Sequence, residues 1–234
     1  MKTIILVCLA ALLLVAPAFA QEDACVDLGG TYDNTAGVCS FANGLTIEIE
    51  YPTEFASEPW AMTVIDSFLD EQRTAIVDAA EVGSAGSPGP YFLGIEYDIF
   101  QYEPNVKSIL FTISDYTGGA HPNLYYQTFT FNFHNNTVLE LDDLLVPSGT
   151  PLTTVSTIVI ADLAAQMGVG ADDSWIAGGA GPTYENYANF VLDADSFTFY
   201  FPPYQVAPYA AGPFHVDVPL SSLRSVFRPP YMKG

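Results

Sequence analysis

Three stretches in the middle of the chain alternate apolar and polar residues with a period of two. Their apolar members are Leu93, Ile95, Tyr97 and Ile99, then Ile109, Phe111 and Ile113, then Phe129, Phe131 and Phe133. This period places apolar side chains on one face of a strand and polar side chains on the other. Strands with one apolar and one wet face are typical of antiparallel sheets. We therefore expect the core to be built on an antiparallel sheet.

Two segments have helical spacing. In 59–80 one side of the predicted helix collects Val64, Ile65, Phe68, Leu69 and Ile76. The segment 150–167 is a second helix candidate, although its β-branched residues weaken helix propensity. Further strands are expected at 45–51, 197–201 and 214–218, short turns at 139–147 and 220–227, and a Gly-rich loop at 167–187. This order predicts an α+β fold with helices packed on the antiparallel sheet.

The first residues have the pattern of a secretory signal peptide. Lys2 precedes an apolar run, and the small residues Ala18 and Ala20 stand before Gln21 as signal peptidase requires. We expect cleavage after residue 20, which makes the product secreted or periplasmic without a transmembrane anchor. The alternative is an uncleaved anchor helix, since about 20 apolar residues span a bilayer. No later stretch is expected to cross a membrane.

The charge of the chain is strongly one-sided. The sequence has 6 basic and 27 acidic residues, and removal of Lys2 would change the net charge from -21 to -22. Nucleic acid and anionic membrane surfaces are therefore excluded as expected partners, because both require a basic surface. A basic partner would be attracted by such a field. The alternative is that the acidity only maintains solubility.

Two cysteines, Cys25 and Cys39, follow the predicted signal peptide. An even number of cysteines in an exported chain predicts a disulfide, here closing a hairpin over residues 21–43. A zinc site is not expected, because neither a CxxC pair nor a nearby histidine is present.

The rest of the chain divides at a Gly/Pro/Ser-rich linker, residues 81–90, which has no capacity for a core. We expect a strand–helix N-terminal subdomain over 44–80 and a larger C-terminal domain over 91–228. Residues 229–234 form a tail.

Local catalytic motifs are not found in the sequence. Its three histidines, His121, His134 and His215, lie far apart and outside metal-ligand spacing. The adjacent acids at 142–143 and 172–173 point in different directions. The prediction is therefore a non-enzymatic protein with no catalytic residue, metal ligand or cofactor. An unrecognised hydrolase with opposed carboxylates across a cleft stays open.

The segment YTGGAHPN, residues 116–123, separates two predicted strands. Gly118 and Gly119 suit positive-φ conformations that bring a ligand close to bare backbone, and a tight connection between strands needs the same freedom. Tyr116 and His121 are candidate ligand contacts, along with the two glycines. The alternative is a structural turn in which the histidine hydrogen bonds across the loop.

A second candidate loop is FYFPPYQVAPYAAGP, residues 199–213. Tyr204, Pro208 and Tyr209 would form a rigid aromatic loop able to stack on sugars or anchor a protein partner. The alternative is a strand crossover fixed by prolines. Trp175 and Tyr184 occur in another exposed-looking loop, where only the composition is informative.

Three segments carry a family resemblance: YTGGAHPN, FTFNF…TVLELDDLL and NYANFVLDADSFTFYFPPYQVAPYAAGPFHVDVPLSSL. The chain resembles, over about residues 44–228, a secreted domain family of unknown function. Its members include the extracytoplasmic domain of the RsiV anti-sigma factor, a domain beside the deacetylase of PdaC and a secreted mycobacterial immunogenic antigen. The resemblance implies an RsiV-like, PdaC-like α+β domain. It also implies lysozyme, a basic protein, as a possible kind of partner.

The resulting expectation is a non-enzymatic binding domain of the bacterial cell envelope whose partner is a basic, lysozyme-like protein. The alternative is a module that binds peptidoglycan or another polysaccharide. The chain has neither a cytoplasmic anti-sigma segment nor a deacetylase domain with metal histidines, so only the fold and a preference for envelope ligands carry over.

Overall fold

The computed structural model describes residues 17–84, 90–147, 149–228 and 231. Most of the predicted signal peptide, the centre of the linker and most of the tail lie outside these residues. Helix α1 (Pro17–Asp27) runs across the predicted cleavage point after residue 20.

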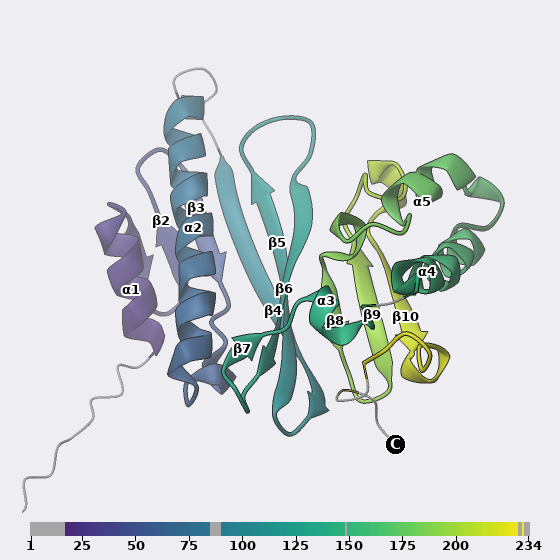
Figure 1. Ribbon diagram of the computed structural model, residues 1–234. Coiled ribbons are helices and arrows are strands. Elements are labelled where there is room, and N and C mark those ends of the chain that lie inside the picture. The colour runs from purple at the N-terminus through teal and green to yellow at the C-terminus, as the bar shows by residue number, and fades with distance from the viewer. Residues whose placement is uncertain (1–16, 85–89, 148, 229–230, 232–234) are drawn as a thin grey trace, which may run out of the picture.

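The elements form four layers (Figure 1). Helices α1 and α2 (Pro59–Ser84) lie outside a seven-stranded sheet, which packs against a three-stranded sheet covered by α4 (Pro151–Met167) and α5 (Asp173–Gly179). Short elements complete the chain: α3 (Leu141–Leu144) and the 3-10 turns η1 (Thr53–Phe55), η2 (Gly168–Gly170), η3 (Glu185–Tyr187), η4 (Tyr209–Ala211) and η5 (Leu220–Ser222). The predicted α+β class is confirmed.

The large sheet has the strand order β1-β2-β3-β4-β5-β6-β7. Its strands are β1 (Thr31–Asp33), β2 (Val38–Ser40), β3 (Leu45–Ile49), β4 (Tyr91–Glu103), β5 (Val106–Tyr116), β6 (Asn123–Asn132) and β7 (Thr137–Val138). All neighbours are antiparallel except β3 and β4, which are parallel. The sheet is thus mixed, because α2 carries the chain back before β4 begins, as a parallel pair requires. Strand β3, which precedes the predicted linker, and strand β4, which follows it, therefore belong to one sheet.

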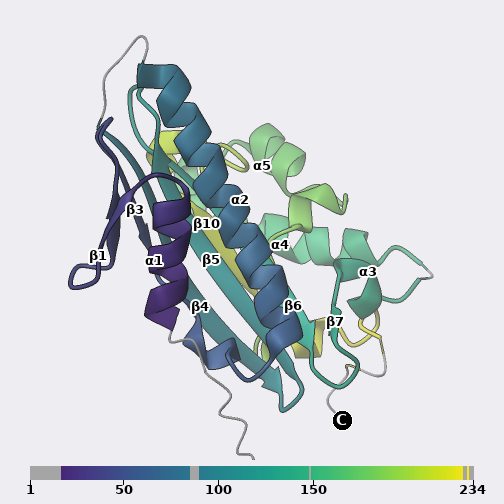
Figure 2. The same ribbon diagram turned by 90° about the vertical axis from the view of Figure 1, so that its left-hand side faces the viewer.

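The apolar face of the large sheet is covered by α2, which crosses it diagonally (Figure 2). The alternating residues of β4, β5 and β6 pack there with Ile65, Phe68 and Leu69 of the helix. The rings of Phe68 and Phe111 lie 5.0 Å apart. The predicted strands and the apolar side of the predicted helix are confirmed, and the helix continues past residue 80 to Ser84.

The opposite face of this sheet is not wet as expected, because strand β8 (Phe190–Leu192) lies across it. Ser108 is 0% exposed and Thr130 1%, and their hydroxyl oxygens lie 2.8 Å apart. Leu192 N donates to Ser108 Oγ at 2.9 Å, and Phe190 N donates to Thr128 Oγ1 at 3.0 Å. The hydroxyls thus satisfy the backbone donors of β8 that face away from its own sheet.

The small sheet has the order β10-β9-β8, with β9 (Ser196–Phe201) and β10 (Phe214–Pro219). Helix α4 buries Leu152, Val155, Val159 and Leu163 beside it. The predicted helix at 150–167 and the last two strands are confirmed. The predicted loop at 167–187 instead contains α5, which begins because the Asp172 side chain accepts hydrogen bonds from the N–H groups of Ser174 and Trp175.

By length and composition, one segment among the described residues is apolar enough to cross a membrane, Pro151–Gly170. This finding differs from the expectation that no stretch after the signal peptide is apolar enough to cross a membrane. In the fold, the apolar side of this segment belongs to the core described above.

Cys25 and Cys39 form the predicted disulfide, with Cα atoms 5.7 Å apart. Cys25 lies on α1 and Cys39 on β2, so the bond joins the helix to the β1–β2 hairpin instead of closing the hairpin itself.

Candidate functional site

The two loops selected from the sequence meet at one end of the molecule, at the top of Figure 1. The β5–β6 loop provides His121, and the β9–β10 loop provides Tyr204 and Tyr209. The ring of His121 stacks on Tyr209 with centroids 3.6 Å apart and an interplanar angle of 19°. The Tyr204 hydroxyl lies 3.2 Å from His121 Nε2, and Tyr209 donates to Pro122 O at 2.8 Å.

Backbone geometry turns the β5–β6 loop toward its partner. Gly118 and Gly119 have φ angles of 91° and 135°, a region that favours glycine. The Tyr116 hydroxyl donates to Gly119 O at 2.9 Å, and the Tyr116 ring stacks on Phe92 with centroids 6.3 Å apart. Tyr116 and the glycines therefore shape the loop that presents His121.

Both ring nitrogens of His121 have hydrogen-bond partners. Nδ1 lies 2.9 Å from Pro122 O, which only accepts hydrogen bonds, so Nδ1 carries the proton. Nε2 lies within hydrogen-bond distance of the Tyr204 hydroxyl, which can donate or accept. The histidine thus links the two loops through Nε2, whereas Nδ1 bonds within its own loop.

Tyr204 is held in an unusual conformation. Its φ is 74°, and the residue is 56% exposed. Its N–H donates to Ala207 O at 3.1 Å, and its carbonyl accepts from Trp175 Nε1 at 3.0 Å. A non-glycine residue at positive φ costs on the order of 1 kcal/mol and persists only where its surroundings hold it. The Tyr204 ring is therefore fixed in place while facing solvent.

Helix α5 holds this loop through close backbone contact. A Cβ atom on Gly179 would lie 1.9 Å from Gln205 O, so only glycine permits the approach. The Gln205 side chain donates from Nε2 to Gly179 O and to Asn186 O, each at 2.9 Å. This packing places the half-buried Trp175 against the Tyr204 backbone. We call His121, Trp175, Tyr204 and Tyr209 the aromatic patch.

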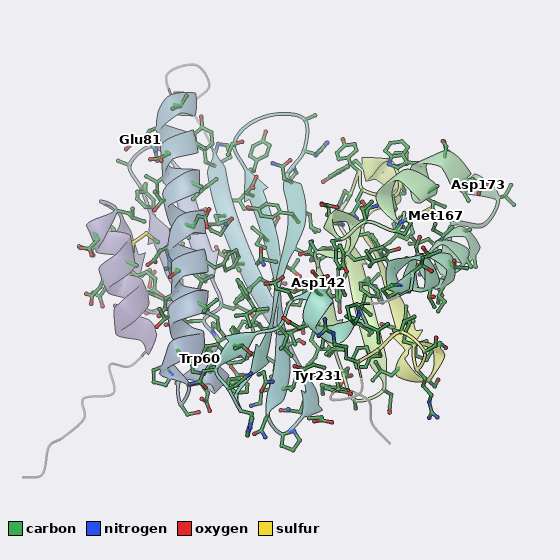
Figure 3. All side chains as sticks on the ribbon, viewed as in Figure 1. Trp60, Glu81, Asp142, Met167, Asp173 and Tyr231 are labelled. Atoms are coloured by element: carbon green, nitrogen blue, oxygen red, sulfur yellow. A yellow bond between two sulfur atoms is a disulfide. The ribbon has the colours of Figure 1, made fainter. Side chains whose placement is uncertain are left out.

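The surroundings of the patch are acidic. Asp172 and Asp173 lie at the start of α5, where Figure 3 labels Asp173. Hydrogen bonds from Ser174 and from the Trp175 N–H hold the pKa of Asp172 below its usual value.

Pro208 is exposed and precedes η4, beside Tyr209. Sequence reasoning had not assigned Trp175 to this site, because its position depends on α5, whose contact with the loop leaves no local pattern.

The remaining histidines have other partners. His215 stacks on Tyr200 with ring centroids 5.9 Å apart, and the backbone of His134 donates to Asn132 Oδ1. In the part of the chain that the structure describes, no histidine hydrogen bonds to a serine and no cluster of potential metal ligands is found.

The adjacent acids at 142–143 and 172–173 form hydrogen bonds with nearby groups of the fold. Asp143 accepts from the N–H of Glu140 at the start of α3, as Asp172 does from the N–H groups at the start of α5. Asp142 hydrogen bonds to the Tyr184 hydroxyl, which raises the pKa of Tyr184. These carboxylates therefore have structural partners.

Residues 142–221 match the model of a family described as a protein of unknown function, DUF3298. The chain is 28% identical over 217 residues to Esterase Rv3036c of Mycobacterium tuberculosis, covering 88% of this chain and 90% of the relative. It is 26% identical to the immunogenic protein MPT64 of the same species, covering 95% and 94%.

A third relative is the peptidoglycan-N-acetylmuramic acid deacetylase PdaC of Bacillus subtilis. Identity is 29% over 140 residues, which is 60% of this chain and 30% of PdaC. The resemblance to a domain family of unknown function shared with PdaC and a mycobacterial immunogenic antigen is thus confirmed.

Two crystal structures of this family have a similar fold. The Bacteroides fragilis protein has a TM-score of 0.52 at 25% identity, covering 79% of this chain and 84% of that protein. The Pseudomonas aeruginosa protein has a TM-score of 0.55 at 16% identity, covering 84% and 88%.

Proposed function

Because this chain contains a DUF3298 domain at residues 142–221, we propose that it is an extracytoplasmic, non-enzymatic binding domain. Its aromatic patch binds peptidoglycan or another envelope polysaccharide. The disulfide between Cys25 and Cys39 supports this location, because structural disulfides persist in oxidising compartments.

The observation that carries the proposal is the fixed, solvent-facing ring of Tyr204. Its N–H donates to Ala207 O and its carbonyl accepts from Trp175, and these bonds hold a backbone conformation that is otherwise unfavourable. An aromatic ring presents a flat apolar face and a polar edge, which suits the mixed surface of a sugar. Fixing that ring before binding lowers the entropy lost on association. The similarity to PdaC, named as a peptidoglycan deacetylase, supports the same ligand class.

Sedimentation with purified, insoluble peptidoglycan tests the proposal. The variant Tyr204→Ala with Tyr209→Ala should lower the bound fraction by at least about tenfold, because the exposed Tyr204 ring and the half-buried Tyr209 ring are both removed. The matched control is Tyr184→Ala, since Tyr184 is 45% exposed but belongs to a different surface. Equal binding of the double variant and the unmodified chain would reject the patch as the glycan site.

A second candidate function is binding of a basic, lysozyme-like protein, which the formal charge of -21 favours. Calorimetric titration with lysozyme at low and moderate salt tests this candidate. Binding should weaken as salt screens the charges. Absence of heat, or affinity that does not change with salt, would reject it.

Ester hydrolysis is the competing enzymatic function, because one relative is named an esterase. Serine esterases need a nucleophile paired with a histidine. The partners of the His121 ring nitrogens are instead Pro122 O and the Tyr204 hydroxyl. Hydrolysis of a p-nitrophenyl ester by the purified chain, lost on replacing a single serine, would replace binding with catalysis as the function.

A further inference from the structure

Among the described residues, strand β6 has no strand partner on one side along most of its length, which leaves a free edge there. On one side it pairs with β5 from Asn123 to Asn132, whereas on the other side β7 pairs only with Phe131 and Asn132. The edge opens into a groove of about 650 Å³, a typical volume for a ligand site. Residues that line this edge groove include Gln127, Thr128, Glu140, Asp142, Tyr184 and Glu185.

The backbone groups at this edge point outward in a defined register. Leu139 N donates to Thr130 O, so the backbone of Thr130 faces away from β5. Orientation alternates along a strand, so Tyr126 and Thr128 also direct their N–H and C=O groups outward. Among the described residues, the outward carbonyl of Thr128 is bonded only by the side chain of Gln127, at 3.0 Å. A flexible amide at this position is readily replaced by the N–H of an added strand.

The sequence of this edge does not oppose strand addition. Natural edges are usually protected by lysine, proline or bulges, whereas residues 124–128, LYYQT, contain neither charge nor proline. Strand addition at a free edge is a recurrent mode of peptide recognition.

The wall opposite the edge selects the charge of the occupant. Glu140, Asp142 and Glu185 line it and are exposed, and no Lys or Arg is among the described residues that line the groove. Figure 3 labels Asp142 at the boundary between the two sheets. Arg228 does not line the groove, although its charge acts to lower the pKa of Tyr184. The Nε of Arg228 donates to Leu145 O at 2.7 Å. Three carboxylates around an open edge favour a cationic segment.

We propose that the edge groove binds an extended, lysine- or arginine-containing peptide segment of a partner protein, which adds to β6 as a strand. The backbone of the peptide bonds to the outward groups of Tyr126 and Thr128, and its basic side chains meet the three carboxylates. A second copy of this chain fits poorly, because it would bring its own acidic surface to an acidic groove. The groove and the aromatic patch share no residue, so this inference does not depend on glycan binding.

Fluorescence anisotropy with capped hexapeptides alternating lysine and valine tests the proposal. The unmodified peptide should bind, and its glutamate–valine counterpart should not. N-methylation of alternate amides removes the donors of one register only. One methylated pattern should therefore abolish binding while the other leaves it nearly unchanged. Equal binding of the two methylated peptides would overturn strand addition. Binding of the glutamate peptide as strong as that of the lysine peptide would overturn charge selection.

Substitutions in the groove test whether the peptide binds there. Glu185→Gln should weaken binding by about two- to fivefold, as expected for one exposed charge pair. Tyr184→Ala should weaken it more, whereas Tyr204→Ala should leave it unchanged. Unchanged binding in both groove variants would place the peptide elsewhere. A concentration-dependent dimer of the free chain that both groove variants abolish would assign the edge to a second copy and overturn the proposal.

Discussion

The buried hydroxyl of Ser108 joins the two sheets, and its removal should destabilise the fold far more than a serine-to-alanine change usually does. Ser108 Oγ accepts from Leu192 N at 2.9 Å and lies 2.8 Å from Thr130 Oγ1. Ser108 and Leu192 are both 0% exposed, so water cannot replace the missing partner in Ser108→Ala.

The magnitude follows from the groups left without partners. An unsatisfied buried N–H costs about 1–3 kcal/mol, and the lost hydroxyl pair adds about 0.5–1.5 kcal/mol. We expect the free energy of unfolding to fall by about 3 kcal/mol. For a chain of this length, that corresponds to a decrease in Tm of roughly 6–12 °C.

The matched control is Ser156→Ala. Ser156 is also buried, and its Oγ donates to Ala180 O at 2.7 Å, but the same carbonyl also accepts from the Tyr187 hydroxyl. Its loss leaves no acceptor without a partner, so we expect a cost of about 1 kcal/mol. Urea unfolding of both variants measures the difference. Equal destabilisation would refute the role of Ser108 in holding β8.

Three further predictions concern the patch, the core and the disulfide. Gly179→Ala should weaken peptidoglycan binding by displacing the Tyr204 loop, while Gly178→Ala, whose Cβ meets no atom within 4 Å, should not; sedimentation measures both. Burial raises the pKa of Tyr187 to about 12 from 10.0, so its contribution to stability is complete below pH 10 and is lost as pH rises toward 12. Urea unfolding across this range should show a shallower decline for Tyr187→Phe, and an identical decline would contradict the assignment. Replacing Cys25 and Cys39 by serine should cost about 3 kcal/mol, because the bond closes a loop between cysteines 14 positions apart, and an unchanged Tm would contradict this prediction.

Local sequence patterns predicted much of the secondary structure. The alternation that includes Ile95, Phe111 and Phe131 predicted β4, β5 and β6, because each strand buries one face against α2. The short strand β8 and helix α5 were missed. β8 has only three residues, all buried, which is too short a run for alternation to appear. The glycines of α5 made its segment resemble a loop, although Gly179 serves the contact with Gln205.

The candidate site was only half predictable. The turn-forming residues of each loop, including Gly118 and Gly119, were visible in the sequence. The meeting of His121 with Tyr204, 83 residues later, depends on the packing of the two sheets. Trp175 joins them only through α5.

The strands, the long helices and the disulfide partners were predictable, because each depends on period, propensity or cysteine count. The parallel pairing of β3 with β4 and the burial of the polar face of the large sheet depend instead on tertiary packing. Periodicity shows which side chains share a face, but it does not show what covers that face. Ser108 and Thr128 therefore have the pattern of solvent-facing residues, although in the fold their hydroxyls accept hydrogen bonds from the N–H groups of β8.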